Sequence, residues 1–331
     1  MSGTHLVIQI LCYNEAQTLP LVVRELPKAI PGVDRLEVLV VDDGSTDGTA
    51  EVAQSLGVDH VVSHPINRGV AAAFQTGLEA SLRAGADIIV NTDGDNQYPG
   101  EYIPALIEPI QGRRADVVIG DRQTHQVEHF TQRKRYLQRL GSRVVSLTAG
   151  TPVPDAASGF RALSREAALR IHVVSTYSYT LETIIQAAKK GLRIQSVPVT
   201  INEPTRQSRL IKSTWSYVRR QALTILQVYT VYEPLRTFSY AAIPFLALGS
   251  VLMLRFAVLY LMMATGVGRH VQSLIVGSML FIVGFVIFLI GLIAHTTATN
   301  RLLLEELLYR QKRQELSSNF GPNSDTERAK A

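Results

Sequence analysis

The chain has 331 residues and a formal net charge of +5 at pH 7, and 46% of its residues are apolar. This composition is too apolar and too weakly charged for a disordered chain, and the single cysteine, Cys12, excludes an internal disulfide. The length is enough for one soluble domain of ordinary size and further segments.

Strand and helix patterns alternate over the first 200 residues. Short apolar runs predict strands, and the stretches between them have helical spacing. This alternation predicts an α/β fold with a mostly parallel sheet covered by helices on both faces. Strands are expected at residues 5–11, 36–41, 60–63, 87–91, 117–120 and 192–201, and Pro198 predicts an edge position for the last. Helices are expected at residues 18–30, 49–56, 69–85, 131–148, 164–171 and 180–190.

Acidic residues follow three of these strands, at Glu15, at Asp42 and Asp43, and at Asp93 and Asp95. Open α/β sheets bind their ligands at the carboxyl ends of the strands, where these groups are expected to meet. The loop at residues 93–97 (DGDNQ) offers oxygen ligands that suit Mg²⁺ or Mn²⁺. An acidic turn is the plain alternative for this loop taken alone. The three clusters together predict a bound cation and a polar ligand.

The C-terminal third becomes strongly apolar. Residues 215–232 have the spacing of an amphipathic helix, which suits a membrane interface or, alternatively, packing on a soluble domain. Residues 237–264 and 271–294 each exceed the roughly 20 residues that span a bilayer. Their short link predicts a transmembrane hairpin, and the Arg and Lys residues on its flanks place both flanks in the cytoplasm. A helix is expected to continue after residue 300, and residues 317–331 are expected to be disordered.

Four motifs in chain order resemble the inverting nucleotide-sugar glycosyltransferases of family 2. They are residues 13–15 (YNE), 39–47 (LVVDDGSTD), 93–97 (DGDNQ) and 155–161 (DAASGFR). The last is closest to the dolichol-phosphate mannose synthase and polyprenyl-phosphate glycosyltransferase branch, in which bacterial and archaeal members carry a similar pair of membrane helices. The resemblance covers about residues 5–210 and implies a Rossmann-like, glycosyltransferase A-type domain. It departs from the family at Leu11, where a proline is common.

The resemblance also implies roles for individual residues in donor binding. Asp93 and Asp95 would be catalytic together with Arg122, and Asp95 and Gln97 would bind Mg²⁺ or Mn²⁺ on the donor diphosphate. The nucleotide sugar would be bound by Tyr13, Glu15, Asp42, Asp43, Asp93, Arg206 and Arg209. The plain alternative for Arg206 and Arg209 is a basic loop near anionic lipid.

The acceptor would be a lipid phosphate, which arrives as an anion and needs a cationic cradle more than a strong base. Guanidinium groups bind phosphate oxygens in a bidentate way. The residues matched to this role are Arg122, Arg135, Arg139 and Ser142. A solvated or membrane-facing surface is the alternative for the basic helix that contains most of them.

The expected function is the inverting transfer of one hexose from a nucleotide diphosphate sugar of the GDP-mannose or UDP-glucose type to polyprenyl or dolichyl phosphate. A processive polysaccharide synthase is one alternative, but residues 211–214 before Trp215 do not fit its Gln-x-x-Arg-Trp motif. A catalytically degenerate membrane scaffold is another, and the intact Asp93, Asp95 and Gln97 speak against it.

The expected organisation is a cytoplasmic catalytic domain (residues 1–210), an interfacial helical segment (211–235), two transmembrane helices (236–298) and a cytoplasmic tail (299–331). The protein is expected in the membrane, the plasma membrane if the source is prokaryotic. Its expected partners are the nucleotide sugar, the lipid and copies of itself through the membrane helices, and no nucleic acid.

Overall fold

The structure, a computed structural model, describes residues 3–123, 142, 145–146, 150, 152–173, 179–202, 230, 232–262 and 271–319. The chain divides into two compact units, one made of Met1–Gln221 with Glu305–Ala331 and the other of Ala222–Leu304. The expected basic helix lies largely outside the described residues, and the interfacial helix lies almost wholly outside them.

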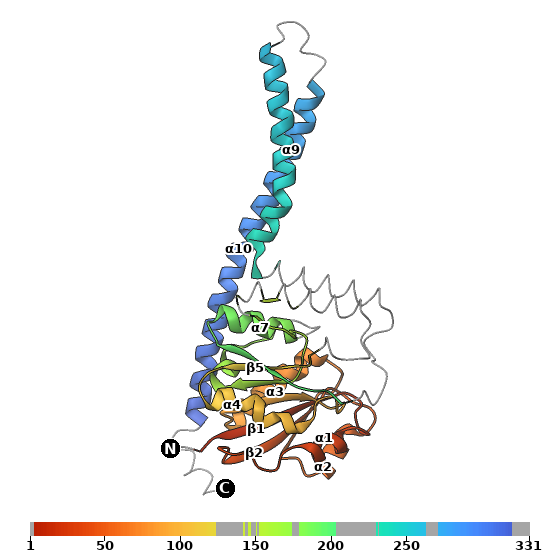
Figure 1. The fold of residues 1–331 in the computed structure, drawn as a ribbon. Coiled ribbons are helices and arrows are strands. Elements are labelled where there is room, and N and C mark those ends of the chain that lie inside the picture. Colours follow the sequence, from red (N-terminus) through yellow and green to blue (C-terminus); the bar gives the residue numbers. More distant parts are fainter. Residues whose placement is uncertain are drawn as a thin grey trace. The chain divides into compact units, whose positions relative to one another are not determined.

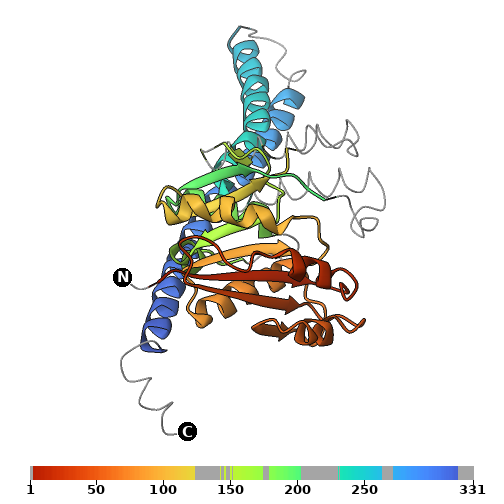
Figure 2. The same cartoon turned by 60° about the horizontal axis from the view of Figure 1, so that its bottom comes forward.

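A seven-stranded sheet forms the centre of the first unit, in the order β3-β2-β1-β4-β6-β5-β7 (Figures 1 and 2). All its described pairings are parallel except those of β6, which runs antiparallel to both β4 and β5. The strands are β1 (His5–Cys12), β2 (Arg35–Asp42), β3 (His60–Ser63), β4 (Ile88–Asp93), β5 (Val117–Asp121), β6 (Arg161–Ser164) and β7 (Ile194–Pro198). The prediction of a mostly parallel sheet with β7 at an edge is confirmed, whereas β6 was not expected from the sequence.

Helices cover both faces of the sheet, as the alternating pattern predicted. Side chains alternate between the faces of a strand, so Leu6, Ile8 and Ile10 of β1 pack in one core cluster with α1 and α4. Gln9, between them, lies against Gly77 of α3 on the opposite face. Besides the last part of α10, the described helices of this unit are α1 (Leu19–Glu25), α2 (Thr49–Ser55), α3 (Val70–Ala84), the short η1 (Gly100–Tyr102), α4 (Ile103–Gln111), α6 (Arg165–Arg170) and α7 (Tyr179–Lys189).

The antiparallel strand β6 determines which segments meet. It pairs Asn91 of β4 and Ile119 of β5 with the same residue, Arg161. Because β6 runs the other way, the segment that precedes it lies at the carboxyl ends of β4 and β5. Residues 155–160 are thereby brought to the edge where the acidic loop after β4 and the end of β5 also lie.

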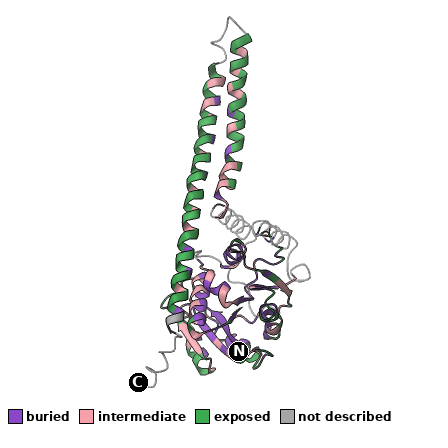
Figure 3. Ribbon diagram, turned by 90° about the vertical axis from the view of Figure 1, so that its left-hand side faces the viewer, coloured by how far each residue is buried: buried purple, intermediate pink, exposed green. Residues whose placement is uncertain are grey.

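The second unit consists mainly of α9 (Pro234–Met262) and the first part of α10 (Val271–Asn319). Both helices are long and apolar enough to cross a membrane, with mean hydropathies of 2.1 and 2.8 over their most apolar windows. Most of their apolar side chains are exposed (Figure 3). Burial in lipid would remove this surface from water, so the exposure is consistent with membrane insertion.

The two long helices pack against each other in antiparallel fashion through glycines. A Cβ on Gly249 of α9 would lie 2.7 Å from the carbonyl oxygen of Gly277, on α10. Likewise, a Cβ on Gly284 would approach Leu246, and one on Gly291 would approach Phe238. Small residues that let two helix backbones approach are typical of membrane helix pairs. This packing supports the predicted hairpin, whose link at residues 263–270 lies outside the described residues.

Candidate active site

The carboxyl ends of β1, β2 and β4 are in register. Cys12 of β1 pairs with Asp42 of β2, and Leu11 pairs with Asp93 of β4. Glu15 follows β1 by three residues and is 6% exposed. Three acidic segments that are far apart in the sequence therefore lie along one edge of the sheet.

The segments after β1 and β2 are locked together by hydrogen bonds. The Asn14 amide N–H donates to Ser45 Oγ at 2.8 Å, and the Thr46 N–H donates to Asn14 Oδ1 at 2.8 Å. Asn14 has a φ of 54°, a left-handed conformation that asparagine tolerates better than most residues. The shape of this side of the edge is thus fixed by the protein itself. We call it the donor side, after the role proposed for it below.

Asp43 on the donor side is buried and bonded to a second loop. Its carboxylate accepts hydrogen bonds from the N–H groups of Arg68 (2.9 Å) and Gly69 (2.8 Å) and contacts His64 Nδ1 at 2.7 Å. Next to it, Gly44 has a φ of 71°, and a Cβ there would meet the main chain of Ile66 and Asn67. Asp43 therefore shapes residues 64–69, whereas its neighbour Asp42 accepts from the Ser45 N–H at 3.1 Å.

The acidic loop after β4 is packed closely on β1. The Gly94 N–H donates to the Leu11 carbonyl at 2.9 Å, and a Cβ on Gly94 would lie 2.7 Å from Cys12 Sγ. Burial, together with the neighbouring Asp95, raises the pKa of Asp93 to about 7. Asp95 accepts from the Gln97 N–H at 3.2 Å, and Asp95 and Gln97 are both partly exposed.

Arg122, just after β5, forms a bidentate ion pair with Asp155. Its Nε lies 2.6 Å from Oδ2 and its Nη2 lies 2.9 Å from Oδ1, and the two side chains are only 12% and 3% exposed. Burial acts to lower the pKa of Arg122, but nearby Tyr98 and Asp155 outweigh it and raise the pKa, so the guanidinium stays charged. A forked pair of this kind fixes the direction of the guanidinium plane.

Arg161, the first residue of β6, is 1% exposed. Its guanidinium donates to the carbonyls of Ser158 (2.8 Å), Ala156 (2.9 Å) and Thr180 (2.7 Å) and to Thr183 Oγ1 (2.5 Å). Burial lowers the pKa of Arg161 to about 10, so it remains a cation at neutral pH. Arg161 therefore ties the loop at residues 155–159 to the start of α7.

Two hydroxyl groups complete the support of this loop. Tyr98 Oη accepts from the Gly159 N–H at 3.2 Å, and Ser142 Oγ accepts from the Ala156 N–H at 3.2 Å. Gly159 also lies close to Asp93, since a Cβ on it would be 3.0 Å from Asp93 Oδ2. We call this region, with Asp93, Asp95, Arg122 and the loop at 155–159, the transfer side, again after the role proposed for it below.

The structure thus gathers most of the residues that the sequence singled out. Tyr13, Glu15, Asp42, Asp43, Asp93, Asp95, Gln97 and Arg122 lie at or beside this edge, and Ser142 contacts the loop at 155–159. Arg135, Arg139, Arg206 and Arg209 lie outside the described residues, so their assignments stay predictions.

Comparison with known proteins identifies the family. Residues 7–171 match the model of "Glycosyl transferase family 2". An undecaprenyl-phosphate mannosyltransferase from Micrococcus luteus is 30% identical, over 58% of this chain and 81% of its own. A dolichyl-phosphate hexose transferase from Haloferax volcanii is 32% identical, over 60% of this chain and 83% of its own. This chain belongs to glycosyl transferase family 2.

Solved structures confirm the fold of the glycosyltransferase. Glucosyl-3-phosphoglycerate synthase from Mycobacterium tuberculosis, in complex with Mn²⁺, UDP and glucosyl-3-phosphoglycerate, superposes with a TM-score of 0.53 at 24% identity. The match covers 68% of this chain and 79% of the synthase. The same enzyme in complex with Mg²⁺ and UDP gives a TM-score of 0.51 at 22% identity, with 68% and 80% covered.

The possible metal ligands of the glycosyltransferase fit a divalent cation that is shared with a substrate. Asp95 offers a carboxylate and Gln97 an amide oxygen, both on one partly exposed loop. Within the described ranges, no group of three or more His, Cys, Asp or Glu residues is placed to hold a metal ion. Mg²⁺ is usually bound through one or two carboxylates and completes its shell with substrate phosphates and water, so this sparse set is suitable.

Asp155 and Arg161 received no role from the sequence, although the motif that contains them was recognised. Asp155 is 33 residues from Arg122, and no local spacing relates the two. Arg161 opens β6, a strand that the sequence did not predict. Only the antiparallel pairing of β6 buries Arg161 and brings Asp155 to Arg122.

Proposed function

We propose that this glycosyltransferase transfers a single hexose, with inversion, from a nucleotide diphosphate sugar to a polyprenyl or dolichyl phosphate. The observation that carries the proposal is the rigidly held Arg122 guanidinium at the edge that also bears Asp93 and Asp95. A cation and an acidic loop at one sheet edge can receive two different phosphate groups. The relatives that act on undecaprenyl and dolichyl phosphates support the identity of the acceptor.

The donor would occupy the edge from the donor side to the acidic loop. Tyr13, which is 41% exposed, would pack on the base, and Glu15 and Asp42 would accept hydrogen bonds from the base and ribose. Asp93 would contact the ribose and sugar. Asp95 and Gln97 would hold a divalent cation against the diphosphate, and this cation would offset the charge that develops on the leaving group.

The acceptor phosphate would bind on the transfer side. Arg122 would orient the phosphate, so that one of its oxygens attacks the anomeric carbon while the bond from that carbon to the diphosphate breaks. The nucleoside diphosphate leaves, and the configuration of the sugar is inverted. A phosphate with a second pKa near 6 is already mostly dianionic at neutral pH, so the reaction requires no strong protein base.

The proposal includes a location and a domain arrangement. The catalytic domain (residues 1–210), the interfacial segment (211–235) and the tail (299–331) would be cytoplasmic, and the apolar helices would anchor the enzyme beside its lipid substrate. The two helices long enough to span a membrane support the anchoring. The excess of Arg and Lys on their flanks supports the orientation.

The test is an assay of the purified full-length protein with a panel of radiolabelled nucleotide sugars, including GDP-mannose and UDP-glucose, and polyprenyl phosphate. We expect one sugar per lipid, an inverted anomeric configuration, and loss of turnover when EDTA removes divalent cations. Products with several sugars would indicate a processive synthase. The absence of turnover with every donor would contradict the proposal.

A further inference from the structure

The last described part of α10, residues 305–316, belongs to the catalytic unit and not to the apolar one. We call it the strap. Glu305, Tyr309 and Leu316 of the strap are buried, with exposed fractions of 7%, 8% and 9%. With Lys312 they recur every three or four residues and so lie on one face of the helix. The neighbouring Glu306 and Arg310 are exposed and pair with each other at 2.9 Å.

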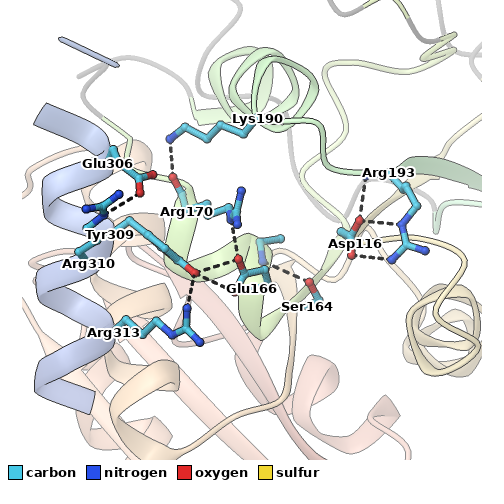
Figure 4. A network of polar contacts seen from close by, with 11 residues as sticks. Asp116, Ser164, Glu166, Arg170, Lys190, Arg193, Glu306, Tyr309, Arg310 and Arg313 are labelled. Carbon is cyan, nitrogen blue, oxygen red and sulfur yellow. Dashed lines mark hydrogen bonds and ion pairs between the residues drawn. The ribbon is translucent and has the colours of Figure 1, made fainter. Parts of the chain in front are cut away.

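The first half of the strap contacts α6 and the end of α7. Glu305 Oε2 lies 2.8 Å from Lys190 Nζ, and these side chains are 6% and 16% exposed. The Tyr309 hydroxyl lies 3.0 and 3.3 Å from the two carboxylate oxygens of Glu166 on α6. The guanidinium of Arg170, also on α6, lies 5.1 Å from the centroid of the Tyr309 ring, in a cation–π arrangement (Figure 4).

The second half of the strap contacts α3. Lys312 Nζ lies 3.2 Å from Glu79 Oε1. Burial acts to raise the pKa of Glu79, but hydrogen bonds from Gln75 and Lys312 outweigh it and lower the pKa, so the pair is charged at neutral pH. Gln75 also accepts from the Val173 N–H at 3.0 Å, which ties α3 to the segment before α7.

The helices that the strap contacts also form the wall behind Asp93. Phe74 of α3 stacks on Tyr179, the first residue of α7, with ring centroids 4.0 Å apart and planes 8° from parallel. The Tyr179 hydroxyl lies 3.0 Å from Asn91 Nδ2 and 3.4 Å from the Gly159 carbonyl oxygen. Gly159 lies directly against Asp93. A shift of α3 against α7 would therefore change the position of Asp93.

We propose that the strap is a positioning element for glycosyl transfer, acting through α3, α6 and α7. Docking of the strap would hold these helices, and with them Tyr179 and the loop at 155–159, in the geometry that the reaction requires. The described contacts of the strap are with these three helices and not with the segments after β1 and β2, so donor binding depends on it less. The inference uses the proposed function for its main assay.

The pair Lys190–Glu305 allows a test with a closely matched control. Glu305→Lys breaks the pair and places two cations together, whereas Glu306→Lys makes the same charge change one residue later on the exposed face. Adding Lys190→Glu to Glu305→Lys restores opposite charges with reversed direction. All variants are made in the full-length protein, and Tyr309→Phe serves as a milder change that keeps the ring and removes only the hydroxyl contact to Glu166.

Three quantities are measured: kcat for transfer to polyprenyl phosphate, nucleotide-sugar affinity by calorimetry, and the rate of tryptic cleavage in the strap. For Glu305→Lys we expect kcat to fall on the order of tenfold, because a small misplacement far from the reacting atoms can cost up to about a hundredfold. Donor affinity stays near that of the parent, and cleavage after Arg310, Lys312 and Arg313 accelerates. The double substitution recovers part of kcat, and Glu306→Lys behaves like the parent. Tyr309→Phe lowers kcat less than Glu305→Lys.

Two results would overturn the inference. One is a kcat for Glu305→Lys and Tyr309→Phe equal to that of Glu306→Lys. The other is a parallel loss of donor affinity and kcat that the double substitution does not relieve, which would mean that the strap only stabilises the fold. Failure of the proposed function has a different signature, namely a parent protein that transfers no sugar to the lipid. The same variants are then compared by nucleoside diphosphate release with water as the acceptor, and the same two criteria apply.

Discussion

The donor side and the transfer side lie on one sheet edge but are built differently. On the donor side, Asp43 accepts from two main-chain N–H groups and contacts His64, and Asn14 is tied to the segment after β2. On the transfer side, the charged group nearest the edge is held by another charged group, in the buried pair of Arg122 with Asp155. There, burial and Asp95 raise the pKa of Asp93 to about 7.

The difference indicates a division of labour. Hydrogen bonds to the main chain fix the shape of a pocket and add little net charge, which suits recognition of a base and ribose. Buried charges act strongly on a reacting centre because the local dielectric constant is low. Changes on the donor side should therefore alter affinity, and changes on the transfer side should alter rate.

Asp95→Asn should have the largest effect. The amide keeps the shape of the side chain but lacks the charge that would hold the proposed divalent cation, and such a cation would contribute several kcal/mol of transition-state stabilisation. We expect turnover to fall by about three orders of magnitude, since each 1.36 kcal/mol corresponds to a factor of ten. Initial rates with excess Mg²⁺ or Mn²⁺ test this. A rate near that of the parent would show that the cation, if used, is held elsewhere.

Arg122→Ala should have the second-largest effect on turnover. Loss of a charge-assisted contact worth about 1.5–3 kcal/mol corresponds to about a ten- to hundredfold loss in acceptor use. Because it leaves the Asp155 charge buried without its partner, we also expect a loss of about 3–5 kcal/mol in the free energy of unfolding. Arg122→Lys should restore only part of the activity, since an ammonium cannot form the forked contact.

The control for Arg122 is Arg193→Ala. Arg193 makes a similar forked pair with Asp116, with both nitrogens 2.9 Å from carboxylate oxygens, but its side chain is 55% exposed (Figure 4). Exposed pairs contribute about 0–1 kcal/mol, so this variant should be nearly normal. A collapse of donor affinity in Arg122→Ala, with unchanged dependence on the acceptor, would place Arg122 in the donor site instead.

Asp155→Asn should reduce use of the lipid phosphate acceptor less than Arg122→Ala does. Arg122 remains in place but loses the carboxylate that fixes its plane, and we expect roughly a tenfold fall in acceptor use with donor affinity unchanged. The free-energy effects of substitutions within one network are not additive. The loss of acceptor use in the double variant Arg122→Lys with Asp155→Asn should therefore be smaller than the sum of the two single losses, expressed as free energies. Strict additivity would show that Asp155 acts independently of Arg122.

Asp43→Asn should have the smallest effect of these variants. It should weaken nucleotide-sugar binding and leave the rate of transfer unchanged. The amide cannot accept all the hydrogen bonds of the carboxylate, so the loop at residues 64–69 loses support, and a loss of about 1–3 kcal/mol in the free energy of unfolding is expected. Donor affinity should weaken while kcat at saturating donor stays unchanged. A lowered kcat with normal donor affinity would remove the distinction between the two sides.

The sequence by itself determined every strand except β6, and the acidic segments that follow three of them. Each β-strand that was expected is a short apolar run or, at residues 192–201, an alternation of apolar and polar residues, and these local patterns need no knowledge of distant contacts. The same holds for the two apolar helices, whose length and composition are local properties, and for the helical continuation after residue 300, which α10 confirms as far as Asn319. Arg122 was assigned to the site because the family resemblance matches it to an arginine that follows a strand end, and the structure places it directly after β5.

Only the tertiary structure decided which distant segments meet. β6 is four residues long and precedes a helix, so its pattern is too short to predict, yet its antiparallel pairing brings Asp155 to Arg122 and buries Arg161. The strap read as a tail, because the partner of Lys312 is Glu79, 233 residues away. Periodicity reports which face of an element is apolar, whereas partners far apart in the sequence are selected by the packing of the whole unit, which no local pattern contains.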